Sequence, residues 1–270
     1  MAQINPTIEE LIRMRVVLTV AGMDAVSVRR DLVYKDADGE PVHMDLYSPA
    51  GSPRSQPAVV LIHGGPIPRI GAKNMGLFVS YGELLAASGC VAITFNHRYL
   101  APAQLAIAGD DVTALVSHIR ANASSLGVDR ERIALWAFSG GGPFLARPLR
   151  ERPAWLRAVV AYYAVLDLEQ PAPGNESHVS AELRQAFSVR RSVGDAPSGP
   201  PMLVARAGLD DAWLNATIDR FVHAALERGV ALDLLNHPQG RHSFDILDDD
   251  DRSKQIIQDT LAFLRNHLRP

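Results

Sequence analysis

The sequence is poor in cysteine, with Cys90 as the only one among 270 residues. A single cysteine excludes an intrachain disulfide and a metal site built from several thiolates. Cys90 begins an apolar run, so we expect it to be a buried structural thiol. No two of the 9 histidines stand at metal-binding spacing beside a carboxylate. We therefore expect neither a catalytic metal nor any other cofactor.

The chain also lacks an excess of charge and any long apolar run. Its net charge of −3 and its pI near 6.3 give no electrostatic attraction to nucleic acid or to an anionic membrane. No apolar run approaches the roughly 20 residues that span a bilayer. The first residues lack the charged and apolar blocks of a secretory signal. These absences predict a cytoplasmic protein without nucleic-acid or membrane partners, and they leave open whether it forms a homo-oligomer.

What the sequence does have is a regular alternation of short apolar segments with segments of helical periodicity. Its 270 residues suit one large α/β domain that spans 1–270. Strands that alternate with helices form parallel sheets, so we expect a mostly parallel sheet with helices on both faces. The expected strands are 58–62, 91–95, 132–138, 158–163, 202–207 and 231–235, and the expected helices include 104–125, 214–228 and 256–268.

The N-terminal part follows a different pattern. Residues 5–20 carry an apolar stripe at helical spacing, with Asn5 as the expected N-cap. Segments 26–34 and 42–47 predict two strands joined by a turn at Gly39. Apolar and polar residues alternate over the second strand, which is typical of an antiparallel strand with one exposed face. We therefore expect an antiparallel edge at the N-terminal end of the sheet.

One long segment interrupts the alternation of strands and helices. Residues 167–200 lie between two expected strands and are rich in proline and polar turn residues. The segment is too long for a plain loop, and such insertions commonly form a lid or a pocket wall. We expect a small cap-like insertion, with a short helix over 181–189.

The most informative short motif surrounds Ser139. An apolar strand ends at Phe138, and Ser139 is followed by Gly140, Gly141 and Gly142 before a helical pattern begins. A serine at a sharp strand-to-helix turn between small residues is the arrangement of a catalytic nucleophile, spelled G-x-S-x-G. Ala137 stands at the first glycine, and it is the next smallest residue.

Three other polar features follow strands of the same expected sheet. Gly64 and Gly65 come after strand 58–62, Asp210 and Asp211 come after strand 202–207, and His242 comes after the last strand. Open α/β sheets bind ligands at the carboxyl ends of their strands. These residues are therefore expected to meet Ser139 at one edge of the sheet.

The chain order Ser, Asp, His and its motifs carry a family resemblance. The sequence resembles α/β-hydrolase-fold serine esterases, near the hormone-sensitive-lipase-like and dienelactone-hydrolase-like branches. The resemblance covers about residues 26 to 268. It rests on His63-Gly64-Gly65-Pro66, on 129–133 leading to Ser139-Gly140-Gly141, on Ala207-Gly208-Leu209-Asp210 and on His242-Ser243-Phe244.

This resemblance implies a role for each motif. Ser139 is the expected nucleophile and His242 its general base. Asp210 is expected to orient His242, with Asp211 as the alternative acid. The backbone amide of Gly140 and that of Gly65 or Gly64 form the expected oxyanion hole, to which the following proline can donate no hydrogen bond.

The expected function is cleavage of small-molecule carboxylic esters with small to medium acyl groups, through an acyl-enzyme and without a cofactor. Alternatives of the same fold are a serine peptidase, for which the chain has no room for a propeller, and a lactone or dienelactone hydrolase, for which Ser139 replaces the usual cysteine. A non-catalytic ligand-binding relative is the alternative of another class, and the presence of His242 counts against it. Lys73, beside the expected site, is taken to be a solvated loop cation.

Overall fold

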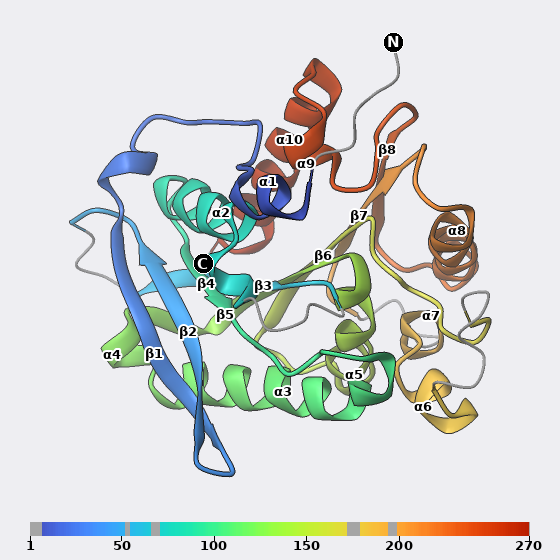
Figure 1. Ribbon diagram of the computed structural model, residues 1–270, viewed down its shortest axis with the longest axis horizontal. Helices are drawn as coiled ribbons and strands as arrows, with labels where there is room; N and C mark the ends of the chain where they lie inside the picture. The colour runs from blue at the N-terminus through green and yellow to red at the C-terminus, as the bar shows by residue number, and fades with distance from the viewer. Residues whose placement is uncertain (1–6, 52–54, 66–70, 172–178, 194–198, 270) are drawn as a thin grey trace.

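The computed structural model describes residues 7–51, 55–65, 71–171, 179–193 and 199–269. Its centre is an 8-stranded sheet in the order β1-β2-β4-β3-β5-β6-β7-β8 (Figure 1). The strands are β1 (Ser27–Ala37), β2 (Glu40–Ser48), β3 (Gln56–Ile62), β4 (Val91–Phe95), β5 (Val128–Phe138), β6 (Leu156–Tyr162), β7 (Met202–Ala207) and β8 (Leu232–His237).

Strand direction follows the sequence pattern. β2 pairs antiparallel with both β1 and β4. The pairs from β4 through β3, β5, β6 and β7 to β8 are parallel. The prediction of a mostly parallel sheet with an antiparallel N-terminal edge is confirmed.

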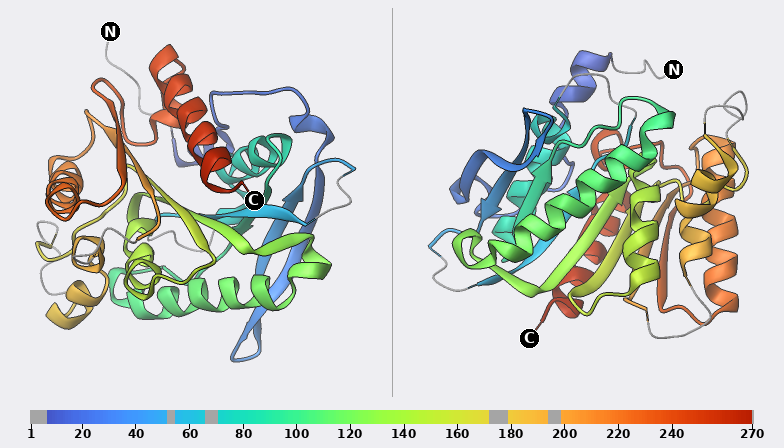
Figure 2. Two further views of the ribbon diagram at one scale, coloured as in Figure 1. Left: turned by 180° about the vertical axis from the view of Figure 1, so that it is seen from behind. Right: turned by 90° about the horizontal axis from the view of Figure 1, so that it is seen from below.

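Helices cover the sheet on both faces (Figure 2). α3, α5 and α8 pack on one face, and α2 and α10 pack on the other. The helices are α1 (Ile8–Arg13), α2 (Gly76–Ala87), α3 (Leu105–Ala121), α4 (Ala123–Leu126), α5 (Ala146–Glu151), α6 (Ala181–Ala186), α7 (Val189–Ser192), α8 (Ala212–Glu227), α9 (Phe244–Leu247) and α10 (Asp251–His267), with 3-10 turns at Met23–Ala25, Ala72–Asn74, Pro102–Gln104 and Ser139–Leu145. In the part of the chain that the structure describes, no helix is both long and apolar enough to cross a membrane.

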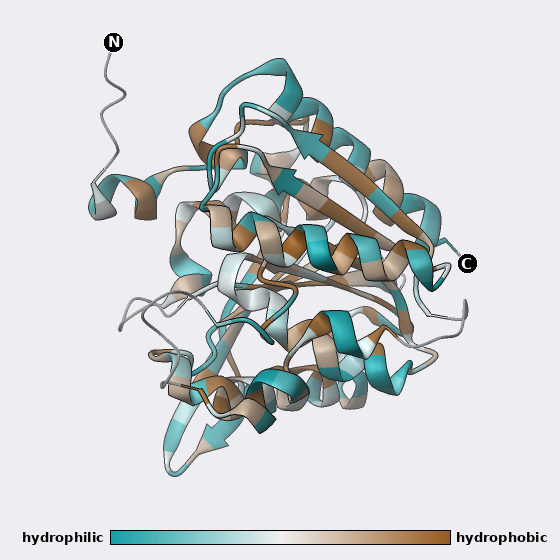
Figure 3. Cartoon of the chain, turned by 90° about the vertical axis from the view of Figure 1, so that its right-hand side faces the viewer, coloured by the Kyte–Doolittle hydropathy of each residue, from teal (hydrophilic) through white to brown (hydrophobic). Residues whose placement is uncertain are grey.

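The two-residue period of the strands divides the core into two layers. In β3, Ala58, Val60 and Ile62 point to the face covered by α3, whereas Val59 and Leu61 point to the face covered by α2 and α10. All five side chains are fully buried. Figure 3 shows the result, with brown strands between helices that carry teal on their outer sides. Cys90 is buried as expected.

Three predictions for the first part of the chain are wrong: the extent of the first helix, the exposed face of β2 and the solvated state of Lys73. The first helix spans only Ile8–Arg13, and its N-cap is Thr7, whose hydroxyl accepts from the backbone of Glu10. The expected cap, Asn5, lies outside the described residues.

β2 has no exposed face along its second half, because α2 covers Tyr47 while Asp45 is buried in an ion pair with Lys73. Lys73 is thus a buried structural cation, only 3% exposed, and not a solvated one.

The segment between β6 and β7 contains α6 and α7. The short helix expected over 181–189 is divided in two, because Ser188 takes an extended conformation between them. Residues 172–178 and 194–198 of this segment lie outside the described residues. α6 and α7 lie on the same side of the molecule as α8 (Figure 1), and Arg228 at the end of α8 donates to the carbonyls of Arg190 and Val193.

Candidate active site

Ser139 occupies the sharp turn that its motif predicts. β5 ends at Phe138, and Ser139 has a φ of 51°, in the left-handed region that a non-glycine residue rarely adopts. Its carbonyl accepts from the amide of Val165 at 3.0 Å, which ties the turn to the segment after β6. A strained, hydrogen-bonded turn of this kind holds a side chain in one position above the sheet.

The candidate oxyanion glycines surround this turn at very short range. A Cβ on Gly64 would lie 2.7 Å from the Cβ of Ser139, and one on Gly140 would lie 2.3 Å from the carbonyl oxygen of Gly65. Only glycine permits such an approach between two backbones. Gly64, Gly65 and Gly140 thus lie together beside Ser139. Pro66 falls outside the described residues.

His242 and Asp210 meet across two loops. Nδ1 of His242 lies 2.7 Å from Oδ2 of Asp210. The two loops are joined by hydrogen bonds from the amide of Leu209 to the carbonyl of Gly240 and from the amide of Gly208 to the carbonyl of His237. The Asp210 side chain is 4% exposed and that of His242 is 39% exposed. The pairing orients the imidazole through Nδ1, and Nε2 makes no hydrogen bond to another described residue.

Asp211 has a different environment. Its carboxylate accepts from the amides of Trp213 and Leu214 at 2.8 and 3.2 Å, which makes it the N-cap of α8. It is exposed and makes no hydrogen bond to His242 among the described residues. Of the two adjacent aspartates, the structure brings only Asp210 to the histidine.

Two other histidines, His63 and His97, support the glycine loop, which is the segment His63-Gly64-Gly65 after β3. The rings of His63 and His97 stack at 3.5 Å with an interplanar angle of 2°. Nδ1 of His63 donates to the carbonyl of Gly64 at 2.6 Å, and Nε2 of His97 donates to the carbonyl of His63 at 3.1 Å. Burial lowers the pKa of His63 to about 4 and holds the pKa of His97 well below its ordinary value. The neutral pair fixes the loop in place.

A buried carboxylate behind His242 escaped the sequence analysis. Asp245 accepts from the hydroxyls of Tyr163 and Tyr81 at 2.8 and 2.9 Å, and the ring of Tyr163 lies 4.8 Å from that of His242. Burial raises the pKa of Asp245 to about 6, although the tyrosine hydrogen bonds act in the other direction. The available signal was an acidic residue inside the apolar stretch 244–247.

A mostly apolar cavity of about 180 Å³ opens from the glycines. It is lined by Gly65 and Gly140 beside Ser139, and also by Trp213 and residues of the segment after β6. A larger cavity of about 230 Å³ lies away from Ser139, between α3 and α5. The smaller one is the candidate substrate pocket, because it borders the oxyanion glycines.

One expected contact is not formed in the described part of the chain, where the Ser139 hydroxyl has no hydrogen bond to His242. Contacts of this kind often tighten only when substrate binds. Within the same described residues, no group of three or more histidine, cysteine, aspartate or glutamate side chains is arranged to hold a metal ion.

Part of the sequence matches a known protein family. The family model named BD-FAE matches residues 44–147, which is less than half of the chain. No curated protein sequence matches the chain.

Solved structures give a broader match. A thermophilic esterase, Est2 of the Planctomycetes species Thermogutta terrifontis, superposes with a TM-score of 0.71 and 21% identity, over 92% of this chain and 95% of that one. Its butyrate-bound form gives 0.68 and 23%, over 90% and 93%. A truncated carbohydrate esterase from gut microbiota gives 0.73 and 17%, over 89% and 96%. The chain has the α/β-hydrolase fold.

Proposed function

We propose that the protein is a serine hydrolase that cleaves small-molecule carboxylic esters, with Ser139 as nucleophile, His242 as base and Asp210 as the acid that orients it. The observation that carries the proposal is the 2.7 Å contact between His242 Nδ1 and Asp210 Oδ2. It fixes the tautomer in which Nε2 is free to accept a proton. The similarity of the fold to that of known esterases supports the same reaction.

In the first half of the reaction, His242 Nε2 removes the hydroxyl proton of Ser139, and the serine oxygen attacks the ester carbonyl carbon. The carbonyl oxygen becomes an anion, for which the amide of Gly140 and that of Gly65 or Gly64 are the proposed donors. The carbon–oxygen bond to the alcohol then breaks, and His242 returns its proton to the leaving alkoxide. An acyl-enzyme on Ser139 remains.

In the second half, water takes the place of the alcohol. His242 removes a proton from the water, whose oxygen attacks the acyl carbon, and the Ser139 oxygen leaves with that proton. The carboxylic acid is released and the enzyme returns to its starting state. Asp210 stays ionised throughout and stabilises the imidazolium form of His242.

The most direct experiment uses paraoxon, because Est2 is known in a form phosphorylated by this compound. We expect the protein to release one equivalent of p-nitrophenolate, to gain a diethylphosphoryl group at Ser139 by mass spectrometry, and to hydrolyse p-nitrophenyl butyrate before but not after the treatment. Ser139→Ala is the matched control and should show neither reaction. A folded wild-type protein that fails to react with either compound would leave a non-catalytic ligand-binding protein as the better explanation.

A further inference from the structure

The residues that line the candidate pocket come from two different parts of the fold. One set of lining residues includes the two glycines, Tyr99 and Pro143, which belong to the sheet edge and its turns. The second set, here called the outer wall, includes Leu168, Pro171, Val179 and Arg184 from the segment after β6, together with Trp213 at the start of α8. What holds this outer wall in place affects how long a bound group can be.

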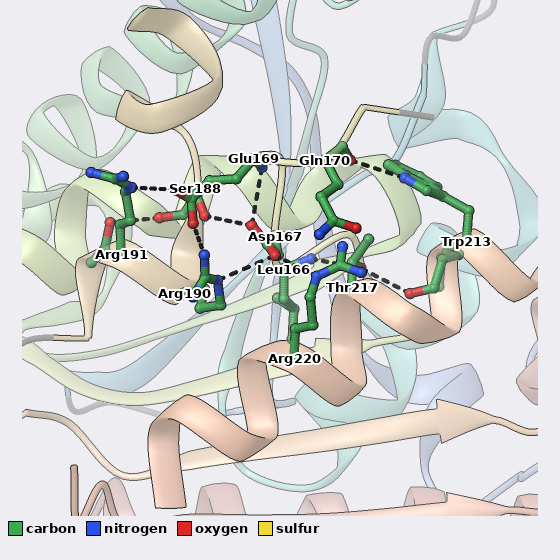
Figure 4. Close-up of polar contacts among 12 residues, drawn as sticks. Leu166, Asp167, Glu169, Gln170, Ser188, Arg190, Arg191, Trp213, Thr217 and Arg220 are labelled. Atoms are coloured by element: carbon green, nitrogen blue, oxygen red, sulfur yellow. Dashed lines mark hydrogen bonds and ion pairs between the residues drawn. The ribbon is translucent and has the colours of Figure 1, made fainter. Parts of the chain in front are cut away.

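Trp213 connects α8 with the segment after β6. Its indole Nε1 donates to the carbonyl of Gln170 at 3.0 Å (Figure 4). Its ring packs against the buried core and lines the cavity. Gln170 stands between two residues of the wall, Leu168 and Pro171. The tryptophan therefore closes the pocket itself and also fixes the backbone that carries its neighbours.

Asp167, one residue before Leu168, holds the same wall to α7 and α8. This carboxylate is fully buried and pairs with Arg220 of α8 at 2.6 Å and with Arg190 of α7 at 3.2 Å. It also accepts from the hydroxyl of Ser188 and the amide of Glu169 at 3.1 and 3.0 Å (Figure 4). Because a buried ion pair that loses a partner is strongly unfavourable, this end of the segment resists displacement.

Chemistry decides which part of an ester enters the pocket. The leaving oxygen must face His242, because that side chain supplies its proton. His242 does not line the cavity, whereas the oxyanion glycines do. The group on the other side of the carbonyl, which is the acyl chain, is the one that points into it.

We propose that this cavity is the acyl pocket and that Trp213, held by Gln170 and the anchored segment, limits it to short, apolar acyl chains. Trp213 is thus a specificity-determining residue. This inference rests on the proposed function, and it names the substrate class of that site.

The test is a chain-length series of p-nitrophenyl esters from acetate to dodecanoate. For the wild type we expect kcat/KM to fall steeply from short to long acyl chains, since each methylene that finds or loses a place in an apolar pocket changes it about 10-fold or more. Trp213→Ala should raise the octanoate-to-butyrate ratio of kcat/KM by about 10-fold or more. Trp213→Phe, which keeps a ring but cannot bind Gln170, should move the ratio in the same direction by less.

Leu209→Ala is the control, since this residue is 59% exposed on the neighbouring loop and does not line the cavity. It should leave the ratio unchanged. If both Trp213 variants fold and also leave the ratio unchanged, the inference is overturned.

A binding measurement separates this inference from the proposed reaction. Ser139→Ala, alone and combined with Trp213→Phe or Trp213→Ala, is titrated calorimetrically with methyl butyrate and methyl octanoate. Preference for butyrate that weakens with the tryptophan changes supports the pocket even if the wild type hydrolyses no ester, in which case only the proposed function fails. Equal binding of both esters by all variants rejects the pocket even if hydrolysis is observed.

Discussion

Gly64 lies so close to Ser139 that a methyl group added to it would stand 2.7 Å from the serine Cβ. Real Cβ atoms do not approach so closely, and Ser139 already has an unfavourable φ of 51°. The turn and the glycine loop are therefore fitted to each other, and neither can shift without moving the other.

The first prediction follows from this contact. Gly64→Ala should displace the loop from Ser139 and lower kcat for p-nitrophenyl butyrate by about 100- to 1,000-fold, the usual effect of losing one oxyanion donor. Gly199→Ala is the matched control, because a Cβ there meets nothing within 4 Å. Steady-state kinetics, with circular dichroism to establish folding, measure both. Full activity in a folded Gly64→Ala protein would show that the loop is not part of the oxyanion hole.

The second prediction separates the adjacent aspartates. Asp210→Asn should lower kcat by about 10,000-fold, because the amide favours the wrong tautomer of His242. Asp211→Asn should have little effect, since asparagine caps a helix as well as aspartate does. The same assay on both variants decides the assignment. The reverse order of activities would make Asp211 the acid and the observed pairing of Asp210 incidental.

The sequence predicts the parts of this protein that depend on local pattern. Apolar runs locate the parallel strands, and the short motifs locate Ser139, Asp210 and His242 at one edge of the sheet. The prediction fails where a residue depends on a distant partner. The pattern of β2 predicts that Asp45 is exposed, but Lys73 and the cover of α2 make it a buried anion. Asp245 was missed for the same reason, since its partners are tyrosines 82 and 164 positions away.

The third prediction concerns that buried pair. Lys73→Met should destabilise the fold by about 3–5 kcal/mol, because it leaves Asp45 buried without its closest cation. Lys73 also contacts Asp31, whose side chain is 68% exposed, so Asp31→Asn should change stability far less. Urea unfolding of the three proteins provides the comparison. Equal losses from the two substitutions would contradict a central role for the contact with Asp45.

The fourth prediction uses the stacked histidines. Burial lowers the pKa of His63 to about 4, so the unfolded chain binds a proton at this residue at higher pH than the folded protein does. The contribution of His63 to stability is present above about pH 6.5 and decreases by about 3 kcal/mol as the pH falls to about 4. His63→Asn can still donate to the carbonyl of Gly64 but does not titrate. Between those pH values the wild type should lose more stability than this variant, as measured by denaturant unfolding, and parallel losses would refute the assignment.

The fifth prediction concerns Asp245, whose effect on stability changes with pH in the direction opposite to that of His63. Burial raises the pKa of Asp245 to about 6, so the folded protein holds this proton more tightly than the unfolded chain. Its stabilising effect is complete below about pH 4 and is lost as the pH rises through about 6, a change of about 3 kcal/mol. Asp245→Asn should therefore gain stability relative to the wild type by this amount between pH 4 and pH 7.

Asp249→Asn is the control for this experiment, because its side chain is 73% exposed beside Lys254. Its stability difference from the wild type should show no comparable rise over the same range. A difference for Asp245→Asn that stays constant with pH would mean that the pKa of Asp245 is the same in the folded protein as in the unfolded chain. The tyrosine hydrogen bonds would then fully offset the cost of burying the charge on this carboxylate.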